Sequence, residues 1–177
     1  MNQGIKVAIA LPVLLGGLFL GGVAALGASP AGGTIRVWGT AGNGGGGSVL
    51  LTGAIGDSGK ASSVNASGTA DKKGSYKLLT LKKGTILLNG TQLNAATNDP
   101  NTPPTSMNST NCSATFVVTE PVPVVSGTKA YAGISGSVNI TVSFAFIEPM
   151  KNGKCNFNAN PIAQYGSIAG SGSVSFG

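Results

Sequence analysis

The most regular alternation of hydrophobic and polar positions lies at residues 138–147. There Val138, Ile140, Val142, Phe144 and Phe146 alternate with asparagine, threonine, serine and alanine. Successive side chains of a strand point to opposite faces, so a period of two predicts a half-buried antiparallel strand.

Shorter β-type runs repeat along the chain. They cover residues 34–38, 48–55, 75–81, 85–89, 114–119 and 167–176. Turn sequences separate them at 56–59, 71–74, 89–90, 126–127 and 152–153, and the Asn-Gly pairs among these predict hairpins because both residues tolerate a positive φ. Prolines predict an irregular loop over 98–108 and a strand end or edge at Pro121 and Pro123. After the amino-terminal segment, the pattern indicates no helix beyond a short turn at 92–97.

About eight short strands at regular spacing predict an all-β fold. In the run at 167–176, Gly170 and Gly172 fall on the same face as Ile168, Val174 and Phe176. Glycines at paired positions allow a strand to coil sharply and its neighbour to approach closely, as barrels require at their corners. The sequence therefore favours an antiparallel closed barrel of about eight strands, with a β-sandwich as the alternative.

The amino terminus has the layout of a secretory signal peptide. Lys6 precedes an uncharged apolar run at 7–26, and small residues follow as far as Ala28. This order predicts a signal helix and a secreted or cell-surface protein, with cleavage after Gly27 or Ala28. The run is also long enough to remain as an N-terminal anchor, the one contact with a membrane that we expect. The expected organisation is a signal peptide at 1–28, a flexible glycine-rich lead with one strand at 29–47, and a single β-barrel domain at 48–177.

Cys112 and Cys155 are the two cysteines of the chain. An even number in an exported chain predicts one disulfide, and two separate buried thiols are the alternative. The bond would close a loop of about 44 residues and contribute on the order of 4 kcal/mol in the chain-entropy model.

The residue types exclude several chemistries. The chain has no histidine, which rules out Ser-His-Asp catalysis and histidine metal sites, and its five acids are scattered in sequence. We therefore expect no catalytic residue, no cofactor and no metal site. Lysines give a net charge of +6, but the pairs at 72–73 and 82–83 fit solvated turns. With Arg36 as the single arginine and no aromatic residues interleaved, we expect no nucleic-acid partner.

The second half of the chain carries a motif with a family resemblance. The run at 127–136 places Gly127, Tyr131, Gly133 and Gly136 in a G-x-x-x-Y-x-G-x-x-G spacing, and the chain ends in a glycine-rich alternating run. This texture resembles the allene oxide cyclase and dirigent-like β-barrels, and small exported bacterial proteins of unassigned role share it. The resemblance covers about 112–176. It implies an eight-stranded barrel with an apolar cavity. Independently of the resemblance, we expect Tyr131 and Ile134 to cover the barrel end.

Two classes of function are compatible with these features. The first is binding of an apolar small molecule, or a structural role at the cell surface. The second, implied by the resemblance, is an isomerase or cyclase that steers a bound hydrophobic molecule. That activity requires polar residues inside the cavity, for which Arg36, Asp57, Tyr76 and Tyr131 are the candidates. A further set of aromatic side chains could line a ligand pocket or belong to the ordinary core: Trp38, Tyr76, Tyr131 and Tyr165.

Overall fold

The computed structural model describes residues 31–41 and 46–177, and antiparallel strands dominate this part of the chain. The strands are β1 (Gly33–Thr40), β2 (Gly47–Gly53), β3 (Asp57–Val64), β4 (Tyr76–Leu81), β5 (Gly84–Asn89), β6 (Ser106–Asn108), β7 (Ser113–Gly127), β8 (Ile134–Ile147), β9 (Met150–Lys151), β10 (Lys154–Cys155) and β11 (Ala163–Phe176). A helix, α1 (Thr91–Asn98), and a 3-10 turn, η1 (Lys129–Tyr131), complete the elements. The predicted signal segment at 1–28 lies outside the described residues.

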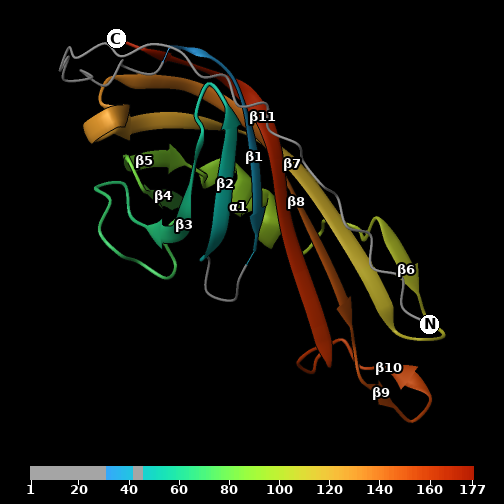
Figure 1. The fold of residues 1–177 in the computed structure, drawn as a ribbon. Helices are drawn as coiled ribbons and strands as arrows, with labels where there is room; N and C mark the ends of the chain where they lie inside the picture. Colours follow the sequence, from blue (N-terminus) through green and yellow to red (C-terminus); the bar gives the residue numbers. More distant parts are fainter. Residues whose placement is uncertain (1–30, 42–45) are drawn as a thin grey trace, which may run out of the picture.

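Eight of the strands close an antiparallel barrel (Figure 1). They follow one another around it in the order β1-β2-β3-β4-β5-β7-β8-β11, and β1 then pairs with β11 over its whole length. The ladder between β5 and β7 is the short one, running from Ile86↔Gly127 to Leu88↔Val124. The predicted all-β closed barrel is confirmed, and the closure excludes the open sandwich.

Strand length divides the molecule into two parts. The strands β1 to β5 have 6 to 8 residues, whereas β7 has 15 and β8 and β11 have 14 each. Because the ladder between β1 and β11 ends at Ser167, the long strands continue past the barrel as residues 113–116, 144–147 and 163–166. We call these residues, with β6 and the β9–β10 hairpin at their far end, the extension (Figure 1).

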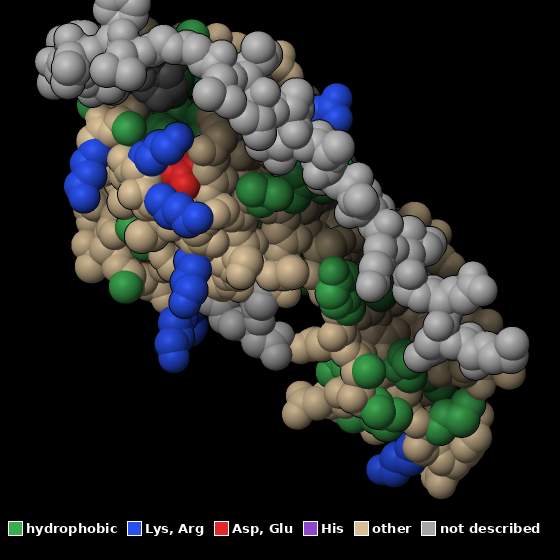
Figure 2. All heavy atoms as spheres, in the orientation of Figure 1, with side chains coloured by type: hydrophobic (Ala, Val, Ile, Leu, Met, Phe, Trp, Pro, Cys, Tyr) green, Lys and Arg blue, Asp and Glu red, His purple; other side chains and the backbone are tan. Residues whose placement is uncertain are grey.

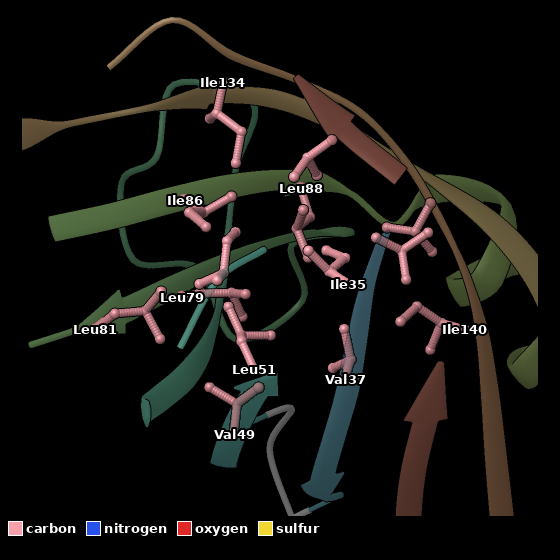
Figure 3. Close-up of a cluster of buried hydrophobic side chains, with 14 of the residues drawn as sticks. Ile35, Val37, Val49, Leu51, Leu79, Leu81, Ile86, Leu88, Ile134 and Ile140 are labelled. Carbon is pink, nitrogen blue, oxygen red and sulfur yellow. The ribbon is translucent and has the colours of Figure 1, made fainter. Parts of the chain in front are cut away.

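The barrel core follows from the alternation in each strand. Figure 3 shows apolar side chains from β1, β2, β4, β5 and β8 pointing toward one another. In β8 the predicted inner positions Val138, Ile140 and Val142 are buried. Phe144 and Phe146 continue that face into the extension, where they are less covered.

Glycines in β11 bring it close to β8. A Cβ on Gly172 would lie 2.1 Å from the Ser137 carbonyl oxygen, and one on Gly170 would lie 2.6 Å from the Ile140 Cδ1. Both glycines pair with inner positions of β8, namely Val138 and Ile140. Their predicted role in close approach is confirmed.

One end of the barrel, the base, is closed. Tyr131 from η1 and Ile134 at the start of β8 are buried there, as predicted for a cover of the barrel end. Gly84 lies beside Tyr131, and a Cβ on it would meet the Thr128 carbonyl at 2.2 Å. The opposite end, the mouth, lies beside α1 and the extension.

The turn at 56–59 was predicted wrongly. Asp57 begins β3 and pairs with Leu51 of β2, so residues 57–59 are part of a strand rather than a turn. The polar residues of β3 are compatible with a strand because they lie in ladders on both sides and Asp57 receives four hydrogen bonds.

The Asn89-Gly90 hairpin was also predicted wrongly. Asn89 ends β5, Gly90 is the N-cap of α1, and the Asn89 Oδ1 accepts a hydrogen bond from the Thr91 N–H. The side chain that favours a turn here favours a helix start equally well. By contrast, Asn152 and Gly153 have φ of 53° and 72° and form the expected hairpin turn between β9 and β10.

The two prolines of β7 lie within a strand, not at its end. Pro121 and Pro123 pair with β8, between the segment of β7 that pairs with β6 and the segment that pairs with β5. In this interval β8 is the one hydrogen-bonded neighbour of β7 among the described strands, so the predicted edge is confirmed. An edge segment tolerates proline because it needs no N–H group on the side that faces no neighbouring strand.

The strand expected within 29–47 is β1, which lies between β2 and β11. The barrel therefore begins at Gly33, ahead of residue 48, where we expected the barrel domain to begin.

The predicted disulfide joins Cys112 and Cys155, whose Cα atoms lie 5.3 Å apart. It connects the start of β7 to β10 and so ties the hairpin to the far end of the extension. Disulfides of this kind are typical of proteins in oxidising compartments. In the described parts of the chain, no helix has the length and apolar character needed to cross a membrane.

Replacing Gly172 by alanine tests the close approach of β11 and β8. We expect Gly172→Ala to lower the free energy of unfolding by at least about 2 kcal/mol, because the backbone of β8 must move to admit the methyl group. Gly56→Ala is the control, since a Cβ there meets no atom within 4 Å. Urea unfolding measures both, and equal stability of the two variants would contradict the packing described here.

Candidate functional site

An apolar cavity of about 290 Å³ opens at the mouth of the barrel. It is lined mainly by inward-facing side chains of the barrel strands, among them Val37, Val49, Ala61, Leu79, Leu88, Val122, Ile140, Val142 and Ile168. Several of these belong to the buried core, so the cavity is the open continuation of the core rather than a surface dimple. Eight-stranded barrels are wide enough to hold one small ligand.

Helix α1 borders the mouth. None of its residues is buried, yet Leu93 packs against the core and lines the cavity together with Asn94 and Thr97. The Thr97 hydroxyl is used within the helix, where it donates to the Leu93 and Asn94 carbonyl oxygens. The helix thus adds one apolar side chain and a polar rim to the opening.

A second hollow, of about 580 Å³, lies on the inner face of the extension. We call this face the shelf; Phe116, Phe144, Phe146, Gln164 and Gly166 line it. The rings of Phe116 and Phe146 stack with their centroids 5.6 Å apart. Both hollows touch Thr40, Ala41, Thr97 and Phe144, so shelf and mouth form one continuous surface.

The extension exposes much apolar surface. Phe144 is 37% exposed and Tyr165 is 64% exposed, and Ile147, Met150, Phe157 and Ile162 are exposed nearby. Figure 2 shows hydrophobic side chains gathered toward the tip of the molecule, where a basic side chain also lies, and most of the other visible Lys and Arg side chains over the barrel. Apolar clusters of this kind mark sites of binding in soluble proteins.

Among the residues that the structure describes, Lys77 is the one ionisable side chain that lines the mouth cavity. It precedes Leu79 and Leu81 at spacings of two in β4, and both leucines are buried in the core. The ammonium group donates a hydrogen bond of 2.6 Å to the Ser63 hydroxyl. Burial lowers the pKa of Lys77 below its usual value.

The aromatic residues considered from the sequence do not converge on one site. Trp38 is 49% exposed on β1, Tyr76 is half-buried, and Tyr131 is buried at the base. Tyr165 alone of the four lines either hollow, at the edge of the shelf. The phenylalanines of the shelf were recognised in the sequence as strand positions and not as lining residues.

Of the polar candidates, Asp57 and Tyr131 meet each other at the base. The Tyr131 hydroxyl donates a 2.6 Å hydrogen bond to the Asp57 Oδ2. The backbone N–H groups of Ser58, Lys82 and Lys83 donate to the same carboxylate, at 2.7, 3.3 and 2.9 Å. Asp57 is 7% exposed, so this carboxylate is buried and well satisfied. Arg36 is exposed, and neither it nor Tyr76 lines the mouth cavity.

These contacts shift the pKa values of both groups. Burial alone would raise the pKa of Asp57, but the hydrogen bonds from Tyr131 and from the three backbone N–H groups lower it to about 2. Burial, the hydrogen bond and the charge of Asp57 raise the pKa of Tyr131 above its usual range. Both groups are held in one protonation state near neutral pH, as suits a structural contact.

Sequence reasoning missed Lys77 and misassigned Asp57. The spacing of Lys77, Leu79 and Leu81 was a signal for an inward lysine, since the three residues share a face in any strand. Nothing local to Asp57 predicts its burial, because its side-chain partner Tyr131 is 74 residues away.

Comparisons of the chain with family models, with curated proteins and with solved structures found no match. Within the described residues, no cluster of three or more potential metal ligands of the His, Cys, Asp or Glu types occurs. The mouth and the shelf are therefore the features on which a functional assignment rests.

Replacing Tyr131 by phenylalanine tests the contact at the base. We expect Tyr131→Phe to lower the free energy of unfolding by about 2 kcal/mol at neutral pH, because a buried carboxylate loses a donor. The pKa of Asp57 is lowered by folding, so its stabilising contribution is full above the ordinary value of 3.8 and is lost as the pH falls toward 2. The difference between wild type and variant should shrink over that interval.

Urea unfolding between neutral pH and pH 2 measures this difference. Tyr165→Phe is the control, because its side chain is largely exposed. A stability difference that stays constant with pH would contradict the assignment of the contact to an ionised Asp57.

Proposed function

We propose that this protein binds an apolar small molecule in the mouth of its barrel, with the shelf supporting the part of the molecule that projects outward. The proposal rests on one observation, which is that the apolar face of the core extends beyond the part of the barrel where it is covered. The inner face that is buried at Val138 and Ile140 continues through the cavity to Phe144 and Phe146, and no element of the described residues covers it there.

The energetics favour an apolar occupant. Apolar surface contributes roughly 25 cal/mol per Å² when it is removed from water. The mouth and the shelf present such surface in a concave shape, which a small molecule covers more completely than a flat patch. The base is filled by Tyr131, Leu51 and Ile55, so the ligand would occupy the mouth half of the barrel alone.

A cyclase or isomerase of the allene oxide cyclase or dirigent type is the second candidate, and the closed barrel with its apolar cavity favours it. Such chemistry needs acid, arginine or tyrosine side chains at the bound molecule. Among the described residues none of these types lines the mouth cavity, whose ionisable group is Lys77. The shelf contributes Asp99, which accepts two hydrogen bonds from Asn101, and the largely exposed Tyr165. Asp57 and Tyr131 are occupied with each other at the base. The site therefore supports binding better than catalysis.

The place of action that we propose is outside the cytoplasm. The disulfide between Cys112 and Cys155 supports this, since such bonds persist in oxidising compartments. The apolar amino-terminal run would provide the export signal.

Titration with phenylnaphthylamine, a neutral dye that fluoresces in apolar surroundings, tests the binding site. We expect wild type to enhance its fluorescence saturably and Ala61→Trp to weaken its affinity at least about 10-fold, because the indole would fill the mouth. Ser62→Trp is the matched control, since the next residue of β3 is exposed and does not line the cavity.

Circular dichroism confirms that both variants fold. If wild type gives no saturable signal, or if the two tryptophan variants bind alike, the proposed site is wrong.

A further inference from the structure

The mouth cavity contains a charge that its apolar lining does not explain. Long lysine side chains normally cross apolar surface and extend the ammonium group into water. Lys77 instead donates to Ser63, a residue that is 8% exposed and lies directly opposite it in the ladder between β3 and β4. The Lys77 side chain therefore lines the mouth with its ammonium group bound to the Ser63 hydroxyl.

Within the described part of the chain, no carboxylate balances this charge. Among the described residues, Lys77 forms no ion pair. Glu120 lies on the face of β7 that carries Val122, but it does not line the cavity. Asp99 lines the shelf hollow, where its Oδ1 accepts two hydrogen bonds from Asn101.

A half-buried ammonium without a counterion is unfavourable, because burial disfavours the charged form. The lowered pKa of Lys77 reflects that cost. An anion placed beside it would offset the cost and would form a charge-assisted hydrogen bond, which is about twice as strong as a neutral one. The net charge of +6 attracts anionic molecules to the protein as a whole.

We propose that the ligand of the mouth is an anionic amphiphile, whose carboxylate, sulfonate or phosphate group binds the Lys77 ammonium while its apolar body lies along Leu79, Leu88 and Phe144. This inference rests on the proposed function and names the class of its ligand. It assigns to Lys77 the role of selecting anionic over neutral molecules of the same shape.

Two dyes with the same aromatic body separate charge from apolar contact. Anilinonaphthalene sulfonate carries a sulfonate, and phenylnaphthylamine does not. We expect Lys77→Met to weaken binding of the sulfonate dye at least about 10-fold and to change binding of the neutral dye less than about 2-fold, because methionine keeps the apolar contacts and removes the charge.

The matched control is Lys60→Met. Lys60 is on the neighbouring strand β3 and is exposed, so its loss should change neither affinity. Lys77→Arg should retain binding of the sulfonate dye within about 3-fold, and Lys77→Gln should lose it while keeping a hydrogen-bonding group near Ser63. Circular dichroism establishes that each variant is folded. If Lys77→Met does not fold, Lys77→Gln takes its place in the comparison.

The outcomes separate the two proposals. If wild type binds neither dye, the proposed function fails. If wild type binds the neutral dye at the mouth but the folded Lys77 variants bind the sulfonate dye as wild type does, the ligand-binding barrel stands and the role of Lys77 is overturned. If Lys77→Met and Lys60→Met weaken binding of the sulfonate dye equally, the effect comes from the overall charge of the protein. That result would also overturn the role of Lys77.

Discussion

A barrel can close only over the length that all its strands share, and in this protein that length is set by the short strands β1 to β5. The three long strands β7, β8 and β11 pair with one another beyond that limit, from Phe116↔Phe144 to Ser113↔Ile147 on one side and from Gly166↔Phe144 to Ala163↔Ile147 on the other. In these three strands, the alternation of inward and outward side chains continues unchanged past the end of the barrel. The apolar inner face therefore continues beyond the closed barrel, where it forms the mouth and the shelf.

The two ends of the barrel handle buried polar groups differently. At the base, the Asp57 carboxylate receives hydrogen bonds from Tyr131 and from three backbone N–H groups, so its charge is fully accommodated by the fold. At the mouth, the ammonium group of Lys77 has Ser63 as its hydrogen-bond partner and no acid among the described residues. A charge that the fold satisfies stabilises the structure, whereas a charge that it leaves unbalanced favours a ligand of opposite sign. This contrast supports the proposal that the mouth binds a ligand, whereas the contact at the base stabilises the fold.

Local pattern predicted the parts of the fold that local physics determines. The alternation from Val138 to Phe146 predicted the inner face of β8, and the glycines of β11 predicted its close approach to a neighbour. Two features of the fold were not predicted, because the local sequence is compatible with another structure equally well. Asp57 resembles a turn residue until Tyr131 is seen to bind it, and Asn89 caps a helix where the Asn-Gly pair predicted a hairpin.

The site could be predicted less well than the fold. Strand alternation shows that Phe144 and Phe146 share a face with Val142, but it does not show where the neighbouring strands stop. That depends on the register between β1 and β11, which ends at Ser167. Lys77 could have been placed on the inner face from its spacing to Leu79, but its position at the mouth depends on the direction of β4 within the closed barrel.

Nuclear Overhauser effects between bound phenylnaphthylamine and the methyl groups of the protein test the central claim most directly. The account predicts contacts from the dye to Leu79, Leu88 and Val142, which line the mouth inside the barrel. Contacts confined to Leu50 and Val125, which are exposed hydrophobic residues that do not line the cavity, would contradict it.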